Sequence, residues 1–255
     1  MTNKIQRAVT DIVGRISSWD SVDTISMVES GEDLYDPYFF ISFDVYCTAD
    51  IPAESRRRTV FEDTVAFESL QSNRKDRFLL RDIPFRIEYK DLRRFDEIIN
   101  AAKANEVVQR DSGTYMFYRL KESQILYQKS DWIDEVRKDL DALNDQFWDG
   151  LRAALEARME HFLGDLHAAV VREDSLFFLI SSAGFIRSLF SVLFAINHRF
   201  DPSARGLYQQ VQELPIVPDP FAGRLDSFLR SESSSMTPQR KKEVAELMAK
   251  SVLAL

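Results

Sequence analysis

The chain has few of the residues on which many well-known binding and catalytic sites depend. It contains one cysteine, Cys47, three histidines and only 8 glycines in 255 residues. A single thiol excludes an internal disulfide and a cysteine-based zinc cluster, so a reducing, cytoplasmic location is expected. His161, His167 and His198 are not spaced to place two imidazoles on one helix face, which argues against a zinc site. The sequence also lacks a glycine-rich phosphate loop, a dinucleotide fingerprint and a Gly-x-Ser-x-Gly elbow.

A broad basic surface is also missing. The formal net charge is -8, and the run 56–58 is the only tight cluster of arginines. Because binding to nucleic acid requires a locally basic footprint, a nucleic-acid partner is not expected.

One long apolar run is present, from Leu176 to Ile196, and Arg187 lies near its centre. A central arginine costs about 2.5 kcal/mol or more in a membrane-spanning helix, so the run is interpreted as a buried bundle helix. The N-terminal residues lack the apolar core of a secretory signal. No membrane partner is expected.

The first part of the chain has the pattern of an α+β fold. Apolar residues recur at spacings of three and four from about Asn3 to Ser17, which predicts an amphipathic helix. A second helix is predicted from 54 to about 64. Alternating or β-branched segments predict strands at 22–29, 38–47, 65–69, 77–80 and 84–90.

From Asp91 onward the spacing of apolar residues changes from two to three and four, and strand signals almost disappear. One long apolar stripe is predicted to run from Trp132 to Leu151 and beyond, and Thr237-Pro238 predicts the start of a last helix. Strands followed by helices predict an α+β domain over residues 1–110 and an all-α helical bundle over 111–255.

Asp44 is the first candidate for chemistry. It shares a strand face with Ser42 and Tyr46, while the opposite face of the strand is apolar. A carboxylate in mid-strand costs stability unless it is solvated, paired or bound to a cation. Glu88 projects from the charged side of the strand 84–90, between Arg86 and Lys90.

The order of these elements resembles the nucleotidyltransferase superfamily, which includes DNA polymerase beta and the aminoglycoside nucleotidyltransferases. Members of that superfamily place a Gly-Ser loop after the first strand, an acidic pair on the second strand and a third carboxylate on a neighbouring strand. The stretches 35–39, 43–46, 76–78, 84–90 and 194–200 further resemble an uncharacterised bacterial nucleotidyltransferase-like family. The resemblance implies a nucleotidyltransferase-like mixed sheet with flanking helices, followed by the helical bundle.

Carried over residue by residue, the resemblance assigns catalysis to Asp44 and Glu88 and nucleotide binding to Ser30, Gly31 and Ser42. Mg²⁺ would be held by Asp44 and Glu88 with Asp36 as a supplementary acid; Glu32, Asp33 and Glu68 are alternatives. The pattern departs from the superfamily in two ways: Ser30-Gly31 has the reverse order, and no second carboxylate alternates with Asp44. A two-metal site normally needs bridging and flanking carboxylates.

The implied function is Mg²⁺-dependent transfer of a nucleotide from a nucleoside triphosphate to a hydroxyl group of a small molecule. A catalytically degenerate binding or regulatory protein is the alternative, in which Asp44 pairs with Arg86 or another base and Glu88 belongs to a cross-strand charge ladder. A third hypothesis is a protein-interaction scaffold built on the helical half.

The acceptor could be cationic. The segment from Asp131 to Asp174 contains twelve acidic and five basic residues, an excess of negative charge that could attract a cation. These acids also fit the solvated face of a long helix.

Overall fold

The computed structural model describes residues 3–28, 39–70, 74–106, 113–230 and 236–255. Ser30, Gly31, Glu32, Asp33 and Asp36 lie outside these ranges. The chain forms two compact units, one of residues 1–101 with 119–142 and the other of residues 102–118 with 143–255. The sequence predicted a single boundary at residue 110, whereas the chain crosses between the units three times.

The first unit contains a six-stranded mixed sheet in the order β3-β4-β5-β2-β1-β6. Strands β2 and β5 run parallel, and the other neighbours run antiparallel. The strands are β1 (Val22–Val28), β2 (Ile41–Cys47), β3 (Val65–Leu70), β4 (Lys75–Leu80), β5 (Ile83–Asp91) and β6 (Gln124–Gln128). The predicted α+β class and mixed sheet are confirmed.

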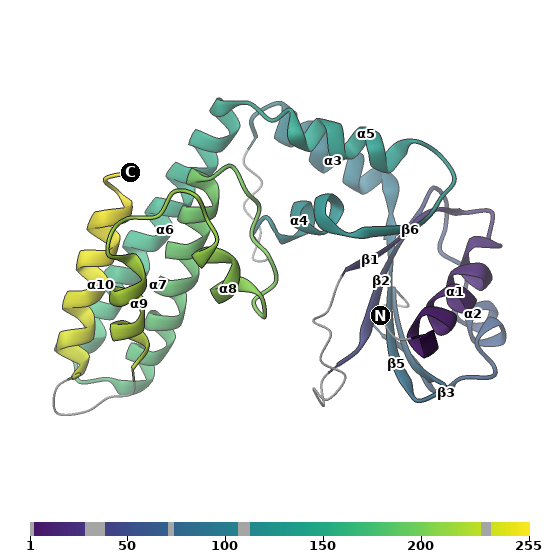
Figure 1. Ribbon diagram of the computed structural model, residues 1–255, viewed down its shortest axis with the longest axis horizontal. Helices are drawn as coiled ribbons and strands as arrows, with labels where there is room; N and C mark the ends of the chain where they lie inside the picture. The colour runs from purple at the N-terminus through teal and green to yellow at the C-terminus, as the bar shows by residue number, and fades with distance from the viewer. Residues whose placement is uncertain (1–2, 29–38, 71–73, 107–112, 231–235) are drawn as a thin grey trace. The chain divides into compact units, whose positions relative to one another are not determined.

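Helices cover this sheet, and Figure 1 shows α1 (Asn3–Ser17) and α2 (Glu54–Val60) on one side of it. The apolar stripe of α1, which includes Ile12 and Ile16, packs with Phe43 and Val45 of β2 in one core. The opposite face of β2 meets α3 (Leu92–Lys103) and α5 (Trp132–Asp141), because Tyr46 packs against Phe95 and Trp132. Helix α4 (Tyr115–Glu122) crosses the boundary between the units.

Three predictions about the helices and strands are wrong. Strand β6 lies beyond Asp91, where only helices were predicted, and it pairs with β1. The stripe predicted to run on from Trp132 is divided between α5 and α6 (Asp145–Val171), because Asn144 begins a new helix by accepting a hydrogen bond from the Phe147 backbone N–H. In addition, the helix predicted from 54 to about 64 ends at Val60.

The second unit is helical around an antiparallel pair, α6 and α7 (Ser175–Ile196). Its other helices are α8 (Leu207–Gln212), α9 (Phe221–Leu229) and α10 (Pro238–Val252). Thr237 caps α10 by accepting a hydrogen bond from the Arg240 backbone N–H, as the Thr-Pro pair predicted. Helices α6 and α7 approach closely at Gly184, where a Cβ atom would lie 2.4 Å from the Phe162 ring.

Within the described ranges, α7 is the one helix long and apolar enough to cross a membrane, with a mean hydropathy of 1.8. Half of its apolar stretch is buried, and Phe185, Leu189 and Leu193 lie in the core of the helical unit. The core helix of a soluble protein has the same length and composition.

Candidate functional site

Asp44 and Glu88 occupy neighbouring strands at the same level of the sheet. Strands β2 and β5 run parallel, and Asp44 is the register partner of Glu88. Register partners on adjacent strands project their side chains to the same face, so the two predicted catalytic carboxyl groups share one face. Asp44 is fully buried, and the side chain of Glu88 is 30% exposed.

A single guanidinium group contacts both of these acids. Arg119, from α4, donates hydrogen bonds from Nε to Asp44 Oδ2 at 2.7 Å and from Nη2 to Asp44 Oδ1 at 2.5 Å. Its Nη1 lies 3.9 Å from Glu88 Oε2. Because a bidentate arginine uses both oxygens of a carboxylate, Arg119 takes up the coordination that Asp44 would otherwise offer to a cation.

Lys90 supplies a second positive charge to Asp44. Its Nζ lies 2.8 Å from Asp44 Oδ2, and its side chain is only 12% exposed. Burial lowers the pKa of Lys90 below its usual value, and the negative charge of Asp44 opposes that shift. The Lys90 ammonium group also lies 5.6 Å from the ring centroids of both Tyr46 and Phe95. Asp44 is therefore held between two cationic side chains.

The alternative in which Asp44 pairs with Arg86 or another base agrees with the structure, but the bases are not Arg86. Arg86 lies over the Phe40 ring at 3.9 Å, while Arg119 and Lys90 contact Asp44. Glu88 also lies 3.3 Å from Lys75, its register partner on β4. This second contact is the cross-strand charge pair that the degenerate alternative predicted.

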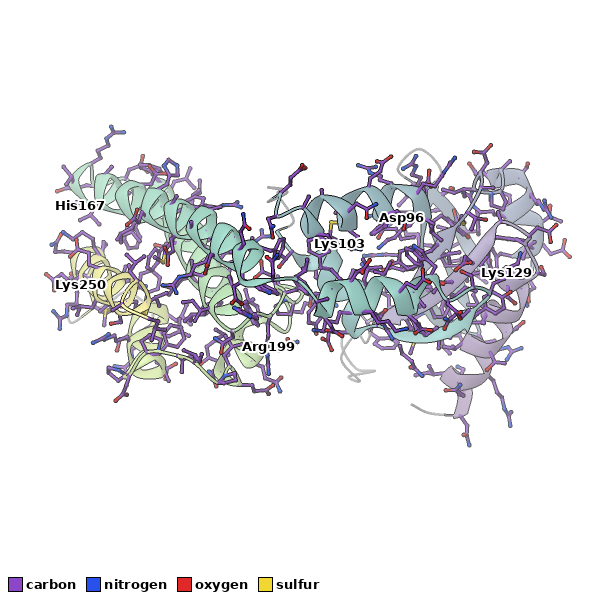
Figure 2. The ribbon with its side chains drawn as sticks, turned by 90° about the horizontal axis from the view of Figure 1, so that it is seen from above. Asp96, Lys103, Lys129, His167, Arg199 and Lys250 are labelled. Atoms are coloured by element: carbon purple, nitrogen blue, oxygen red, sulfur yellow. The ribbon has the colours of Figure 1, made fainter. Side chains whose placement is uncertain are left out.

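Helices enclose the Asp44 face of the sheet. Tyr46, two residues along β2, is completely buried, and burial raises the pKa of its phenol well above the usual value. The ring centroids of Trp132 and Tyr46 are 5.0 Å apart. The Trp132 indole N–H donates a hydrogen bond to Asp96 of α3, and Asp96 is labelled in Figure 2. Arg137 on α5 donates to the backbone carbonyls of Leu120 and Ser123. The two bonds from Arg137 hold the C-terminal end of α4, which carries Arg119.

The described residues around Asp44 do not form a ligand set suited to a divalent metal ion. Within the described ranges, no group of three or more histidine, cysteine, aspartate or glutamate side chains is close enough to hold one. Mg²⁺ requires nearly octahedral oxygen ligands, whereas both Asp44 oxygens already accept from cations. A metal ion at this position would leave Arg119 and Lys90 buried without their carboxylate.

The remaining predicted residues lie apart from this cluster or outside the described ranges. Ser42 is half-buried on β2, opposite Arg86 in the register. Glu68, an alternative metal ligand, forms an exposed pair with Arg77 at 2.7 Å. Ser30, Gly31 and Asp36 belong to the segment that the structure does not describe.

The acids that suggested a cationic acceptor are exposed on two successive helices. Asp134 and Asp141 lie on α5, and Asp145 and Asp149 lie on α6. These positions fit the solvated helix faces that the sequence offered as the alternative.

Sequence reasoning missed the two residues that define the site. Arg119 is 75 positions from Asp44, and nothing in the pattern of α4 relates it to β2. Lys90 lies two residues after Glu88 on β5, so the alternating pattern already placed both side chains on the same face. The signal that could have identified a partner was Asp44 itself, because a buried carboxylate requires a cation or several hydrogen-bond donors.

Two solved structures that match this chain have related descriptions. A nucleotidyltransferase-like protein from Exiguobacterium sibiricum matches with a TM-score of 0.50 and 11% identity, over 98% of this chain and 74% of that one. An aminoglycoside 6-adenyltransferase from Bacillus subtilis matches with a TM-score of 0.32 and 8% identity, over 98% of this chain and 90% of that one. No protein-family model and no curated protein sequence matches. At 11% identity the likeness to the Exiguobacterium sibiricum protein concerns the fold alone, and the chain has a nucleotidyltransferase-like fold.

Proposed function

We propose that the α+β unit is a catalytically degenerate nucleotidyltransferase-fold module with a binding or regulatory role. The observation that carries this proposal is the position of Arg119, whose guanidinium group contacts both Asp44 and Glu88. These are the two carboxylates that the resemblance assigns to the metal. An arginine between them supplies positive charge without the open coordination positions that metal-dependent catalysis requires.

Metal binding at Asp44 would leave two buried cations without their carboxylate partner. Asp44 is completely buried, and Arg119 and Lys90 are 13% and 12% exposed. Separating a buried ion pair so that one charge loses its partner costs about 3–5 kcal/mol. Glu88 also has Lys75 as a partner, so a metal ion would compete for both acids.

A second candidate function is Mg²⁺-dependent nucleotidyl transfer to the hydroxyl group of a small molecule. The observation in its favour is the register of β2 and β5, which places Asp44 beside Glu88 as two acids on neighbouring strands. Under this hypothesis the metal must displace Arg119 from both carboxylates. Metal and nucleotide binding would then depend strongly on each other.

Calorimetric titration of ATP with and without Mg²⁺ separates the two functions. The degenerate module predicts either no ATP binding or an affinity that Mg²⁺ changes by less than about twofold. An increase of tenfold or more with Mg²⁺, lost in Asp44→Asn and kept in Glu68→Gln, would establish the enzyme instead. Glu68 is a suitable control because it is an acid of the same sheet in an exposed ion pair. Circular dichroism checks that both variants are folded.

A further inference from the structure

The helical unit contains a groove that the proposed function does not use. Its volume is about 800 Å³, and the described residues that line it all belong to that unit. Ser175 and Ser191, near the two ends of α7, both line the groove. Because a helix rises 1.5 Å per residue, the groove follows α7 for about 24 Å. The groove is therefore long, and one helix forms its floor.

The walls of the groove are largely apolar. Phe178 and Ile186 of α7 line it together with Phe228 of α9. Two leucines at the groove are unusually open to solvent: Leu179 is 66% exposed and Leu229 is 52% exposed. Specific ligand sites commonly have volumes of about 300–1,000 Å³ and apolar walls with a few polar groups. The size and lining fit an apolar molecule of extended shape.

Two polar groups in the groove lack a partner in the described part of the chain. Lys241, in the first turn of α10, is half-buried and forms no ion pair there. The Ser182 hydroxyl group is buried and makes no hydrogen bond to any described residue. A half-buried ammonium group and a buried hydroxyl group are both stabilised by an acceptor that a ligand supplies.

The other end of the groove is satisfied internally. Asp201 accepts a hydrogen bond from the Ser191 hydroxyl at 3.0 Å, and its backbone N–H donates to the Thr114 hydroxyl at 2.7 Å. Arg187 lies close enough to stabilise the charge of Asp201. The polar groups at this end of the groove are therefore paired with each other. At the other end, Lys241 is a cation with no ion-pair partner among the described residues.

We propose that this groove binds a single-chain amphiphile with an anionic head group, with the head group at Lys241 and the apolar tail along α7. An anion is favoured because Lys241 is a partly desolvated cation that lines the groove. A tail is favoured because the walls between the two polar ends are apolar and Leu179 and Leu229 are exposed.

The test measures binding of decanoate, and of decanol as its uncharged analogue, to the full chain by calorimetry. Decanoate is expected to bind with a micromolar Kd, and decanol about tenfold more weakly, because the charged head group forms the bond to Lys241. Lys241→Gln should weaken decanoate binding about tenfold and leave decanol unchanged. Ala183→Trp, which places an indole in the groove at an exposed position of α7, should weaken both ligands.

Lys250→Gln is the matched control. Lys250, labelled in Figure 2, is an exposed lysine of the same helix and is not among the residues that line the groove. It should bind decanoate as the unaltered chain does. The proposal is overturned if decanoate does not bind, if Ala183→Trp binds it normally, or if Lys241→Gln and Lys250→Gln have equal effects. A dimer that Ala183→Trp dissociates, without decanoate binding, would also overturn it and would make the groove an interface between copies of the chain.

Discussion

Arg119 donates two hydrogen bonds to the carboxylate of Asp44, although 75 positions of sequence separate them. The pair joins α4 to the middle of β2, on a sheet face that helices cover. Because Asp44 is completely buried, this contact and the contact with Lys90 together compensate the charge that mid-strand burial would otherwise penalise.

Arg119→Met is expected to destabilise the chain. The methionine keeps the apolar stem and removes the guanidinium group, so Asp44 retains only Lys90 as a close cation. Loss of one partner of a buried ion pair lowers the free energy of unfolding by about 3 kcal/mol. The measurement is the midpoint of urea unfolding.

Two further variants control for this effect. Arg77→Met removes a cation from an exposed pair with Glu68 and should cost less than about 1 kcal/mol. The double variant Asp44→Asn/Arg119→Met should lose less unfolding free energy than the sum of the losses in the two single variants, because the two residues contact each other. Equal effects of Arg119→Met and Arg77→Met would contradict the structural importance of the buried pair.

Gly184→Ala is expected to destabilise the helical unit. A Cβ atom at Gly184 would lie 2.4 Å from the Phe162 ring, so α6 and α7 could not keep their close approach. Overpacking of this kind costs about 1–3 kcal/mol. Thermal unfolding followed by circular dichroism measures the change.

Gly164→Ala is the matched control for that experiment. Gly164 lies within α6, and a Cβ atom there meets nothing within 4 Å. Alanine has the higher helix propensity, so this change should stabilise by about 0.5–1 kcal/mol. Destabilisation by both alanines would show that the contact with Phe162 is not the cause.

Cys47 should make stability fall at alkaline pH. Burial raises the pKa of its thiol from 9.0 to about 12. Above pH 9 the unfolded thiol ionises while the folded thiol does not, so its stabilising contribution is present below pH 9 and lost as pH rises towards 12. Between pH 9 and pH 10 the loss is about 1 kcal/mol. Urea unfolding at the two pH values, compared with Cys47→Ala, should show a smaller decrease in the variant; parallel decreases would contradict the assignment.

Local patterns in the sequence predicted much of the fold. The spacing of Ile5, Ile12 and Ile16 defines α1 with the bounds that the structure shows, and alternation places β2 and β5. Thr237 and Pro238 mark the start of α10. These features depend on residues within one or two turns or along one strand, so they are visible in a single sequence.

The features that the sequence did not reveal depend on contacts between distant segments. Strand β6 has only five residues, and it exists because it pairs with β1 about 100 positions earlier. The position of Asp44 showed that the charge of a buried carboxylate must be compensated. Solvent, a base or a metal ion could each supply that compensation, and the sequence did not distinguish between them. Arg119 decides between these because tertiary packing, which spacing does not encode, brings α4 to β2.

The most direct test of the central claim is titration of the chain with Mn²⁺ in the presence of ATP, followed by the electron paramagnetic resonance of free Mn²⁺. If Arg119 and Lys90 occupy the carboxylate of Asp44, the chain should remove no more Mn²⁺ from solution than ATP alone does, and Asp44→Asn should behave in the same way. Stoichiometric Mn²⁺ binding by the unaltered chain that Asp44→Asn abolishes would contradict the account.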